Sequence, residues 1–303
     1  MASDPGWELY RSFLGVLKEG SLSGAARALG VAQPTVGRHV AALEQALGLA
    51  LFTRSQFGFT PTEAAIALRP YAQTLATTAA ALQRVAASQG SGVRGTVRIT
   101  ASDVVGVEVL PPILARLREA HPDLVIELVL TNRVQDLLRR EADIAVRMMR
   151  PQQESLIARR IGNIELGLHA HRAYLARRGT PRTEAALAGH ALIGFDEETA
   201  FVRSLRKSLG GMRREAFALR TDSDLAQLAA IRAGYGIGAC QVALAQRDSE
   251  LVRVLRKQFT LQLDTWVTMH EDLRDSPRCR VTFDALVAGL TGYIGGSAAR
   301  ADD

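Results

Sequence analysis

The chain has 303 residues, of which 47% are hydrophobic and 22% are charged, and its formal net charge is +6 at pH 7. These values favour a globular protein of two or three domains, and the positive balance weakly favours a polyanionic partner. Two cysteines are too few for a disulfide framework, and the chain shows neither a secretion signal nor a run of about eighteen apolar residues, so we expect a cytoplasmic protein with no membrane partner.

Three helices are predicted in the N-terminal part of the chain. Apolar residues recur at helical spacing within residues 7–19, and two shorter helical patterns follow at residues 23–29 and 34–47. The last pattern places its apolar residues on one face, as an amphipathic helix does. Four residues are then expected on the opposite face: Thr35, Arg38, His39 and Ala42. The three apolar faces can share one small core.

The spacing of small residues between the second and third helices indicates a helix-turn-helix. Ala26 lets the two helices approach closely, Gly30 takes a backbone turn, and Val36 fills the angle between the helices. An ordinary helical hairpin has the same periodicity. Only the residues on the exposed face can distinguish it from a helix-turn-helix that binds DNA. That face has no acidic residue before Glu44, which suits insertion into a groove lined by phosphates.

A short β-hairpin, or wing, is predicted after the third helix. Aromatic and aliphatic residues flank Gly58 in the stretch LALFTRSQFGFT, which begins at Leu49. Arg54, at the base of this hairpin, could reach a phosphate or the minor groove of DNA. A solvent-exposed cation without a ligand is an equally good interpretation of Arg54.

A long helix is predicted over residues 62–88. Thr62 is expected to cap this helix, and Glu63 lies in its acidic first turn. Its apolar residues repeat with spacings of four and three, as in a coiled-coil seam. The members of this seam are Leu68, Ala72, Leu75, Ala79, Leu82 and Ala86. We expect the seam to join two copies of the chain, although a helix packed inside one subunit has a similar pattern.

Strand and helix patterns alternate beyond a flexible hinge at residues 89–94. The first series is predicted as strand, helix, strand, helix and strand at Thr96 to Ala101, Val107 to Glu119, Leu124 to Leu130, Val134 to Arg140 and Ile144 to Met148. The second series has strands at residues 191–195, 217–221, 237–240 and 265–269 and helices at residues 224–233 and 283–290. This order implies a parallel α/β sheet with right-handed crossovers, divided into two lobes with a cleft between them.

No catalytic or metal-binding motif stands out. The glycine run from Gly234 matches G-x-G-x-x-A, but it follows a helix and precedes a strand, which is the reverse of the order in a dinucleotide site. His169 and His171 would share one face of a strand, yet no cysteine or carboxylate at metal-ligand spacing accompanies them. Cys240 and Cys279 are expected to be buried small hydrophobic residues. We therefore predict no cofactor and no metal.

The N-terminal part of the chain resembles the winged helix-turn-helix of the LysR-type transcriptional regulators in the stretches FLGVLKEGSLSGAARALGVAQPTVGRHVAALEQALGLALFTRS and TPTEAA. The later part is similar to the effector-binding domain of that family in GTVRITAS, LPPILARLREAHPDLVIELVLTN and DLLRREADIAVRM. The stretch AIRAGYGIGACQ is similar to a glycine-rich turn late in the same domain. These matches cover most of the chain up to about residue 245, and the first is the most specific.

The resemblance implies an α/β protein with an N-terminal winged helix-turn-helix, a long linker helix and a two-lobed periplasmic-binding-protein-like effector domain. The implied boundaries are a DNA-binding domain at 1–61, a linker helix at 62–88, a hinge at 89–94 and an effector-binding domain at 95–303. Lobe I would comprise residues 95–165 and 268–300, and lobe II residues 166–267.

The resemblance also implies which residues meet DNA. These are Gln33, Pro34, Thr35 and Arg38 at the start of the recognition helix and Arg54 in the wing. The chain departs from the family at Gly37, where a serine that bonds to DNA is common, so one contact is expected to be lost.

Residues at the predicted strand ends, all but one of them polar, are the candidates for effector binding. On lobe I these are Ser102, Asp103, Thr131, Asn132 and Arg147, and on lobe II they are Phe195, Thr221, Asp222 and Ser223. Each could instead be a helix cap or a polar loop residue. The helix N-termini and Arg147 predict a small, anionic organic effector.

The resulting prediction is a sequence-specific transcription regulator that dimerises through the linker helix. The family resemblance further implies a homotetramer that bends promoter DNA and contacts RNA polymerase. An enzyme that uses the α/β cleft is the alternative, but no nucleophile, base or metal cluster supports it. A solute-binding protein is a third possibility, which the lack of a signal sequence opposes.

Overall fold

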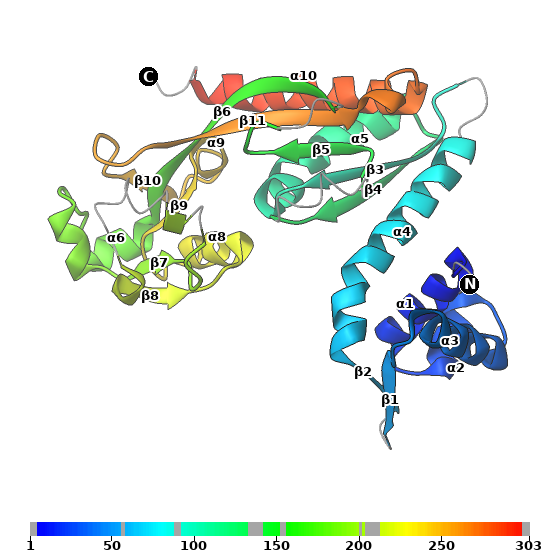
Figure 1. Cartoon of the computed structure of the whole chain (residues 1–303). Coiled ribbons are helices and arrows are strands. Elements are labelled where there is room, and N and C mark those ends of the chain that lie inside the picture. The colour runs from blue at the N-terminus through cyan, green and yellow to red at the C-terminus, as the bar shows by residue number, and fades with distance from the viewer. Residues whose placement is uncertain are drawn as a thin grey trace. The chain divides into compact units, whose positions relative to one another are not determined.

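The computed structural model describes residues 5–55, 58–87, 92–132, 142–151, 156–199, 202–203 and 213–298. The chain divides into an N-terminal unit that ends at residue 89 and a C-terminal unit that begins at residue 90, and both are drawn in Figure 1. The helix predicted at residues 134–140 lies outside the described residues.

The N-terminal unit contains the three predicted helices, the hairpin and the long helix. In chain order these are α1 (Trp7–Glu19), α2 (Leu22–Leu29), α3 (Gln33–Leu47), β1 (Phe52–Ser55), β2 (Gly58–Pro61) and α4 (Glu63–Ala87). One buried core joins them and consists of Phe13, Val16, Ala25, Ala26, Val36, Val40, Leu43, Leu51, Phe52, Ala65 and Ala72. The prediction that three helices share one small core is confirmed.

The turn between α2 and α3 has the geometry of a helix-turn-helix. Gly30 ends α2 in the left-handed region, with φ at +68°, and its N–H bonds back to the last turn of α2. Ala26 and Val36 are buried, at 6% and 0% exposure, so that α3 packs closely on α2. Because a side chain at Gly30 would strain this turn, the three positions together set the angle of α3.

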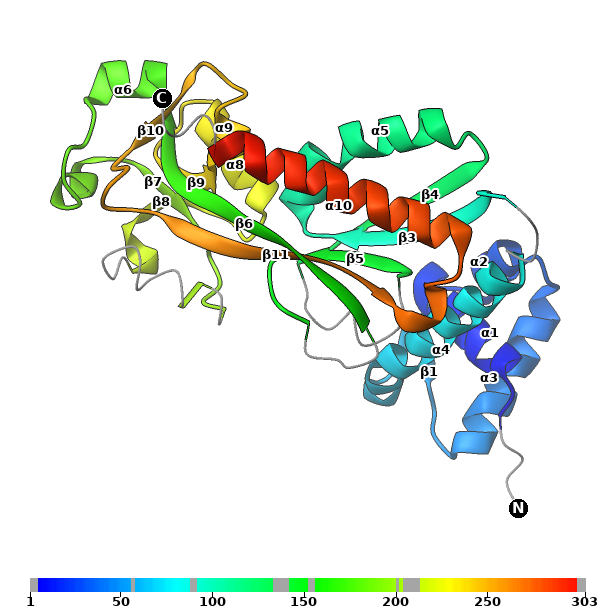
Figure 2. The ribbon, with the colours of Figure 1, turned by 90° about the horizontal axis from the view of Figure 1, so that it is seen from above.

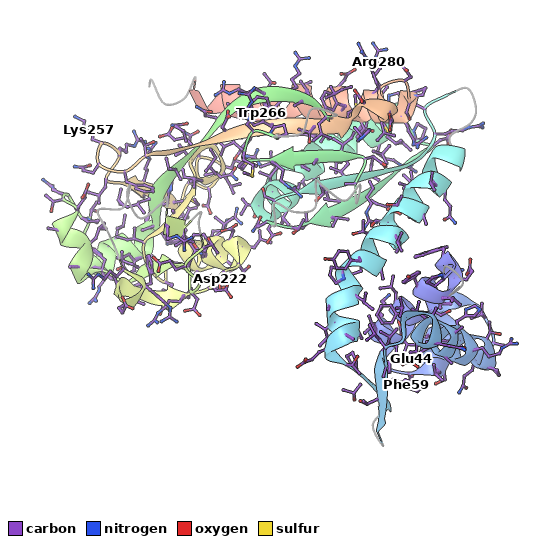
Figure 3. The ribbon with its side chains drawn as sticks, viewed as in Figure 1. Glu44, Phe59, Asp222, Lys257, Trp266 and Arg280 are labelled. Atoms are coloured by element: carbon purple, nitrogen blue, oxygen red, sulfur yellow. The ribbon has the colours of Figure 1, made fainter. Side chains whose placement is uncertain are left out.

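Glu44 connects α3 to the wing. Its Oε1 accepts the backbone N–H of Leu51 at 2.7 Å and that of Phe52 at 3.2 Å. The ring of Phe52 packs against that of Phe59 across the hairpin, with ring centroids 5.8 Å apart, and Glu44 and Phe59 lie at this junction in Figure 3. Glu44, the first acidic residue of α3, is thus bonded to the backbone of the wing. It lies at the end of the helix that is remote from the predicted DNA contacts.

The C-terminal unit is built on a seven-stranded sheet whose main order is β10-β6-β11-β5-β3-β4, with β9 paired to β6. Its strands are β3 (Gly95–Ala101), β4 (Leu124–Leu130), β5 (Ile144–Arg147), β6 (Leu156–His171), β9 (Gly238–Gln241), β10 (Leu251–Val254) and β11 (Leu261–His270). A second, two-stranded parallel sheet holds β7 (Leu192–Gly194) and β8 (Phe217–Arg220).

The expectation of a parallel sheet holds for one part of the seven-stranded sheet and is wrong for the rest. Within the described seven-stranded sheet β3 pairs in parallel with β4 and β5, whereas the pairs that involve β6, β9, β10 and β11 are antiparallel. The long strands β6 and β11 pair along ten residues of β11, from Leu261 to His270. Antiparallel neighbours need no crossover helix, so the alternation of predicted elements did not reveal them. The pairing shifts by one residue between Thr265 and Trp266, beside Gly162.

The strands β6 and β11 extend through both lobes of this unit (Figure 1). Lobe I has a core of β3, β4, β5, α5 (Leu110–Ala120) and α10 (Pro277–Ala298). Lobe II has two buried clusters around β7, β9, α6 (Arg172–Arg178), α8 (Asp224–Arg232) and α9 (Val242–Ala245). Figure 2 shows α10 along β6 and β11, beside α5. The predicted lobe boundaries at residues 165 and 267 fall inside β6 and β11.

Candidate functional site

The start of α3 presents four of the predicted DNA-binding residues together. Gln33, Pro34 and Arg38 are exposed and Thr35 is half-buried, and Arg38 Nη2 lies 3.5 Å from Thr35 Oγ1. The opposite face of the helix is buried in the core of the unit, and no side chain caps its N-terminus. This turn therefore carries polar side chains and one cation on a rigid, accessible edge, as readout in a major groove requires.

The wing places the backbone of Arg54 in β1, opposite Phe59, while the Arg54 side chain lies outside the described residues. The wing itself is tied to the turn after α1, because the Phe59 N–H donates to the Gly20 carbonyl at 3.1 Å. This bond fixes the hairpin on the same body as α3.

His39 does not share the exposed face on which the sequence placed it. Its Nδ1 lies 2.8 Å from Oγ of Ser12 in α1, and Ser12 is only 3% exposed. His39 lies at the edge of the apolar face of α3, where it is half-buried and its ring contacts the buried hydroxyl of Ser12. Gly37 has room for a side chain, since an added Cβ would have Leu22 Cδ1 at 3.6 Å as its nearest neighbour. A serine would therefore fit at this position, and packing does not explain the absence of its DNA contact.

The predicted seam on α4 is divided between two environments. Ala72 is 2% exposed and belongs to the core of its own subunit, so it is not available to a partner helix. Leu68 is half-buried and packs against the same core. Leu75 and Leu82 are exposed, at 47% and 68%, and Ala79 is half-buried. The Ala86 side chain lies outside the described residues.

Two exposed apolar residues of α4 were missed by the sequence prediction. Tyr71 is 73% exposed and Ile66 is 60% exposed. Tyr71 precedes Leu75 by four residues, and Leu82 follows Leu75 by seven, so these three share one stripe of the helix. The spacing of Tyr71 from Leu75 is the sequence signal for this stripe, whereas the predicted seam contains Ala72 at the neighbouring position.

In the C-terminal unit the ends of β3 and β4 meet lobe II through Asn132. Its Nδ2 donates to Asp103 Oδ2 at 3.3 Å and to Asp224 Oδ2 at 3.0 Å, while the Asp103 N–H donates to Asn132 Oδ1 at 3.2 Å. The structure thus brings Asp103 and Asn132 together as predicted, with Ser102 and Thr131 as their chain neighbours. Asp224 was missed because an acidic residue in the first turn of a helix is explained by the helix alone.

The predicted run on lobe II has local structural roles. Ser223 Oγ caps α8 by accepting a backbone N–H at 3.2 Å. Asp222 Oδ1 accepts the N–H groups of Asp196 and Glu197 at 3.1 and 2.9 Å, and Thr221 Oγ1 accepts the Ser223 N–H. For these three residues the structure shows the helix cap and loop contacts that the sequence left open as an alternative.

Arg147 is the candidate cation for an anionic ligand. It ends β5, is 5% exposed, and donates to Thr100 Oγ1 at 2.7 Å and to the Val146 carbonyl at 3.0 Å. An anion at this position would compete with bonds inside the lobe I sheet.

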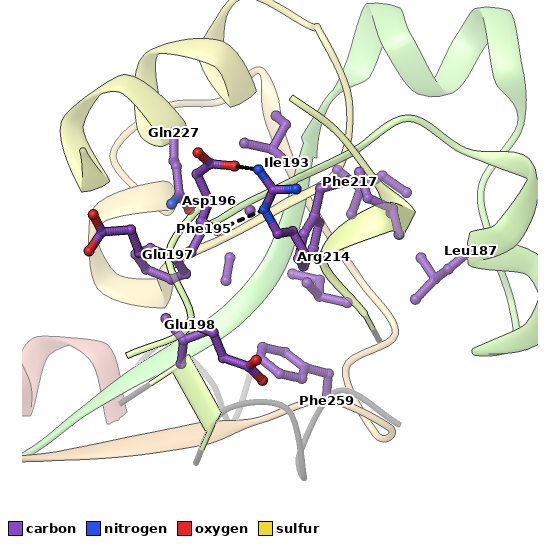
Figure 4. Close-up of a pocket in the computed structure, with 16 residues that line it drawn as sticks. Leu187, Ile193, Phe195, Asp196, Glu197, Glu198, Arg214, Phe217, Gln227 and Phe259 are labelled. Carbon is purple, nitrogen blue, oxygen red and sulfur yellow. Dashed lines mark hydrogen bonds and ion pairs between the residues drawn. The ribbon is translucent and has the colours of Figure 1, made fainter. Parts of the chain in front are cut away.

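Phe195 lines a pocket within lobe II, shown in Figure 4. The pocket is mostly apolar, and its lining includes Leu168, Leu187, Leu192, Ile193, Phe217, Ile237 and Phe259. At its edge Arg214 forms an ion pair with Asp196 and donates to the Asp196 carbonyl at 2.9 Å. Such a lining suits the apolar body of a small organic ligand. The other predicted effector residues do not line this pocket.

The two cysteines are buried, as predicted. Cys240 Sγ lies 3.3 Å from Nδ1 of His169, which also contacts the Gly167 carbonyl at 2.9 Å. Burial raises the pKa of the Cys240 thiol to about 12 and lowers the pKa of His169 to about 4. Both groups are therefore neutral at pH 7, and Cys240 is not a reactive thiolate.

Two family models match the chain. Residues 90–291 match the LysR substrate binding domain, and residues 7–66 match the bacterial regulatory helix-turn-helix protein of the lysR family. The chain belongs to the LysR family. Within the part of the chain that the structure describes, no helix has the length and apolar character to span a membrane.

Several regulators resemble this LysR-family chain. PgrR of Escherichia coli is 29% identical over 265 residues, which cover 83% of this chain and 87% of PgrR. CrgA of Neisseria meningitidis and a regulator of Xanthomonas campestris are each 30% identical over 185 and 183 residues, about 60% of this chain. The matched part of the chain spans 62% of the length of that CrgA and 53% of the Xanthomonas protein.

Two solved LysR-family structures share the fold. The structure of CrgA has a TM-score of 0.58 at 25% identity and covers 93% of this chain and 98% of its own. CbnR, a LysR family regulator, has a TM-score of 0.65 at 19% identity and covers 97% and 99%. The N-terminal helix-turn-helix and the α/β effector domain predicted from the sequence are thereby confirmed as the fold class.

Proposed function

We propose that this LysR-family chain is a sequence-specific transcription regulator, and not an enzyme, that binds promoter DNA in the cytoplasm and responds to a small molecule. The observation that carries the proposal is the first turn of α3. There Gln33, Pro34, Thr35 and Arg38 point outward while Val36 holds the helix on its core. The names of the relatives PgrR and CrgA, both transcriptional regulators, agree with it.

We propose further that α4 joins two copies of the chain. The exposed stripe of Tyr71, Leu75 and Leu82 supports this, because a row of large apolar residues on a helix is stabilised by a partner surface. Two paired chains would present two α3 helices to successive major grooves. Assembly of two dimers into a tetramer, and contact with RNA polymerase, follow from the family resemblance.

The proposed effector is a small organic molecule bound in the C-terminal unit. The pocket beside Phe195 supplies an apolar wall in lobe II. Ser102 and Thr131 supply polar groups at the ends of two lobe I strands, outside that pocket. An anionic charge on the effector remains a prediction that depends on Arg147.

Calorimetry tests the charge of the effector. Titration of the full-length protein with a panel of benzoate, short aliphatic carboxylates and their amides is expected to give heat for at least one carboxylate and none for its amide, since only the anion can attract Arg147. Binding of neutral amides alone would contradict the anionic prediction.

The regulator itself is tested by footprinting. The full-length protein on the DNA upstream of its own gene is expected to protect two half-sites about one helical turn apart or a multiple of it. A cell extract that contains the effector should change the extent of protection. Protection without any sequence preference would contradict the proposed function.

Arg38→Ala is expected to weaken binding to the footprinted site by about 1–3 kcal/mol, because Arg38 is the cation placed to bond a base edge. Fluorescence anisotropy on the specific site and on random DNA measures the effect. Arg11→Ala is the control, since Arg11 is an exposed cation on α1 paired with Glu8. An unchanged ratio of specific to random affinity in Arg38→Ala would remove Arg38 from base readout.

A further inference from the structure

Helix α8 of lobe II contacts lobe I at both of its ends. Its last residue, Arg232, forms two bonds to the Glu108 carboxylate, at 2.6 and 3.1 Å. Its first residue, Asp224, accepts the bond from Asn132 at 3.0 Å. Between these ends Val104 of lobe I packs against the buried cluster of α8 and α9. Contacts along α8 therefore join lobe II to lobe I, in addition to the hydrogen bond from Tyr293 to Gln241.

The two ends of α8 respond differently to pH. The hydrogen bond from Arg232 lowers the pKa of Glu108 and the same bond raises the pKa of Arg232. Each partner of this ion pair therefore favours the charged form of the other. The Arg247 side chain adds a bond to the Glu108 carbonyl at 2.9 Å. The C-terminal end of α8 is consequently a fixed point of contact.

The N-terminal end of α8 brings two carboxylates to one amide group. Asp224 Oδ2 and Asp103 Oδ2 both accept from Asn132 Nδ2, one from each side of the lobe boundary. The charged residues that act on Asp224 are Asp103 from lobe I and Asp222 from its own lobe, and both are acidic. No described lysine, arginine or histidine forms an ion pair with Asp224 or Asp103.

Like charges and burial disfavour the ionised form of a carboxyl group. Burial, then the charge of Asp103, and more weakly that of Asp222 raise the pKa of Asp224 to about 6, although the Asn132 hydrogen bond acts in the opposite direction. Because the pKa of Asp224 is raised in the closed arrangement, that arrangement binds the proton more tightly than an open one does. Closure is therefore favoured at low pH and loses this advantage as the pH rises from the ordinary aspartate value of 3.8 to about 6.

We propose that Asp103, Asn132 and Asp224 form a proton-operated latch between the two lobes, which closes when Asp224 binds a proton and opens when it releases it. The protonated Asp224 still accepts the Asn132 bond but no longer repels Asp103. The Glu108–Arg232 ion pair holds the other end of α8 while the latch opens. This regulation of the effector domain rests on the proposed function, since it would set how readily the lobes admit an effector.

The distance between the lobes tests the latch. Full-length protein with Glu119→Cys in α5 and Lys257→Cys in lobe II would be labelled with a fluorescent donor and acceptor and diluted with excess unlabelled protein. Both sites are exposed and the native cysteines are buried, so the labels go to the introduced thiols. Energy transfer is expected to fall as the pH rises, with a midpoint between the ordinary aspartate value of 3.8 and about 6.

Three substitutions in the labelled protein separate the latch from other titrations. Asp224→Asn is expected to keep the high transfer of the closed state at every pH. Asp103→Asn should move the midpoint down by about 1 pH unit, because one repelling charge is removed. Glu184→Gln, which removes an exposed carboxylate of the same lobe outside the latch, should titrate like the unsubstituted protein.

A pH-independent distance in the unsubstituted protein, or a transition that persists in Asp224→Asn, would overturn the latch. Should Asp224→Asn fail to fold, the Asp103→Asn variant decides, since an unchanged midpoint overturns the proposal as well. The assay contains no DNA, so its result is independent of the footprint. Failure of the latch leaves DNA binding by α3 intact, and failure of DNA binding leaves the distance measurement unaffected.

Discussion

Leu75→Glu combined with Leu82→Glu is expected to convert the dimer into monomers and to weaken binding to a two-half-site operator by about 10²- to 10⁴-fold, the advantage that linking two binding modules provides. Both leucines are exposed in the single chain, at 47% and 68%, so the glutamates are tolerated in the monomer. In a paired α4 they would place like charges within an apolar contact, where desolvation is costly.

Sedimentation equilibrium measures the oligomeric state, and fluorescence anisotropy on a full operator and on a single half-site measures the affinity. The single half-site should be bound about as well by the variant as by the original protein. Gln73→Glu is the matched control, because Gln73 is exposed on α4 away from the stripe of Tyr71, Leu75 and Leu82. Dimers that persist in the double variant would show that another surface joins the chains.

Phe13→Ala is expected to lower the free energy of unfolding of the N-terminal unit by about 3–5 kcal/mol, the usual cost of removing a buried phenylalanine ring. Phe13 has no exposed surface, and its ring lies 5.7 Å from that of Phe52 at the start of the wing. Because domains of this kind are stable by only about 5–15 kcal/mol, the variant would lose much of its folded population and its DNA binding.

Urea unfolding followed by Trp7 fluorescence reports on this unit when Trp266 is replaced by phenylalanine, since these are the two tryptophans of the chain. Leu286→Ala is the control, because Leu286 is equally buried but belongs to lobe I of the C-terminal unit. It should leave the Trp7 transition in place. A Phe13→Ala midpoint equal to that of the original protein would mean that the N-terminal core is not organised around this ring.

Helices, strands and turns that depend on residues close together in the sequence could be predicted. The bounds Trp7–Glu19 of α1 and Leu124–Leu130 of β4 agree with the prediction, because helical periodicity and a short apolar run are properties of the segment itself. Thr62 caps α4 as expected, accepting the Ala65 N–H at 3.2 Å. The turn at Gly30 was likewise predictable, since its φ is imposed locally.

Features that depend on distant partners were not predictable. His39 is fixed by Ser12 in another helix, and Ala72 is buried because α4 passes over the helix-turn-helix core. Asp224 acquires its role only when lobe I brings Asn132 to it. The antiparallel pairing of β6 with β11 joins segments about a hundred residues apart, which no periodicity records.

The pairing of β6 with β11 constrains how the two lobes can move. Because both strands continue from one lobe into the other, the described connection between the lobes is a hydrogen-bonded ribbon, and a change in the angle between the lobes would bend it. The easiest place to bend is the register shift at Thr265 and Trp266, since a β-bulge locally weakens the ladder, and Gly162 beside it has φ at +145°. Because resistance to bending grows with the bending angle, we expect the effector domain to change its shape gradually, by an amount that depends on the size of the bound ligand.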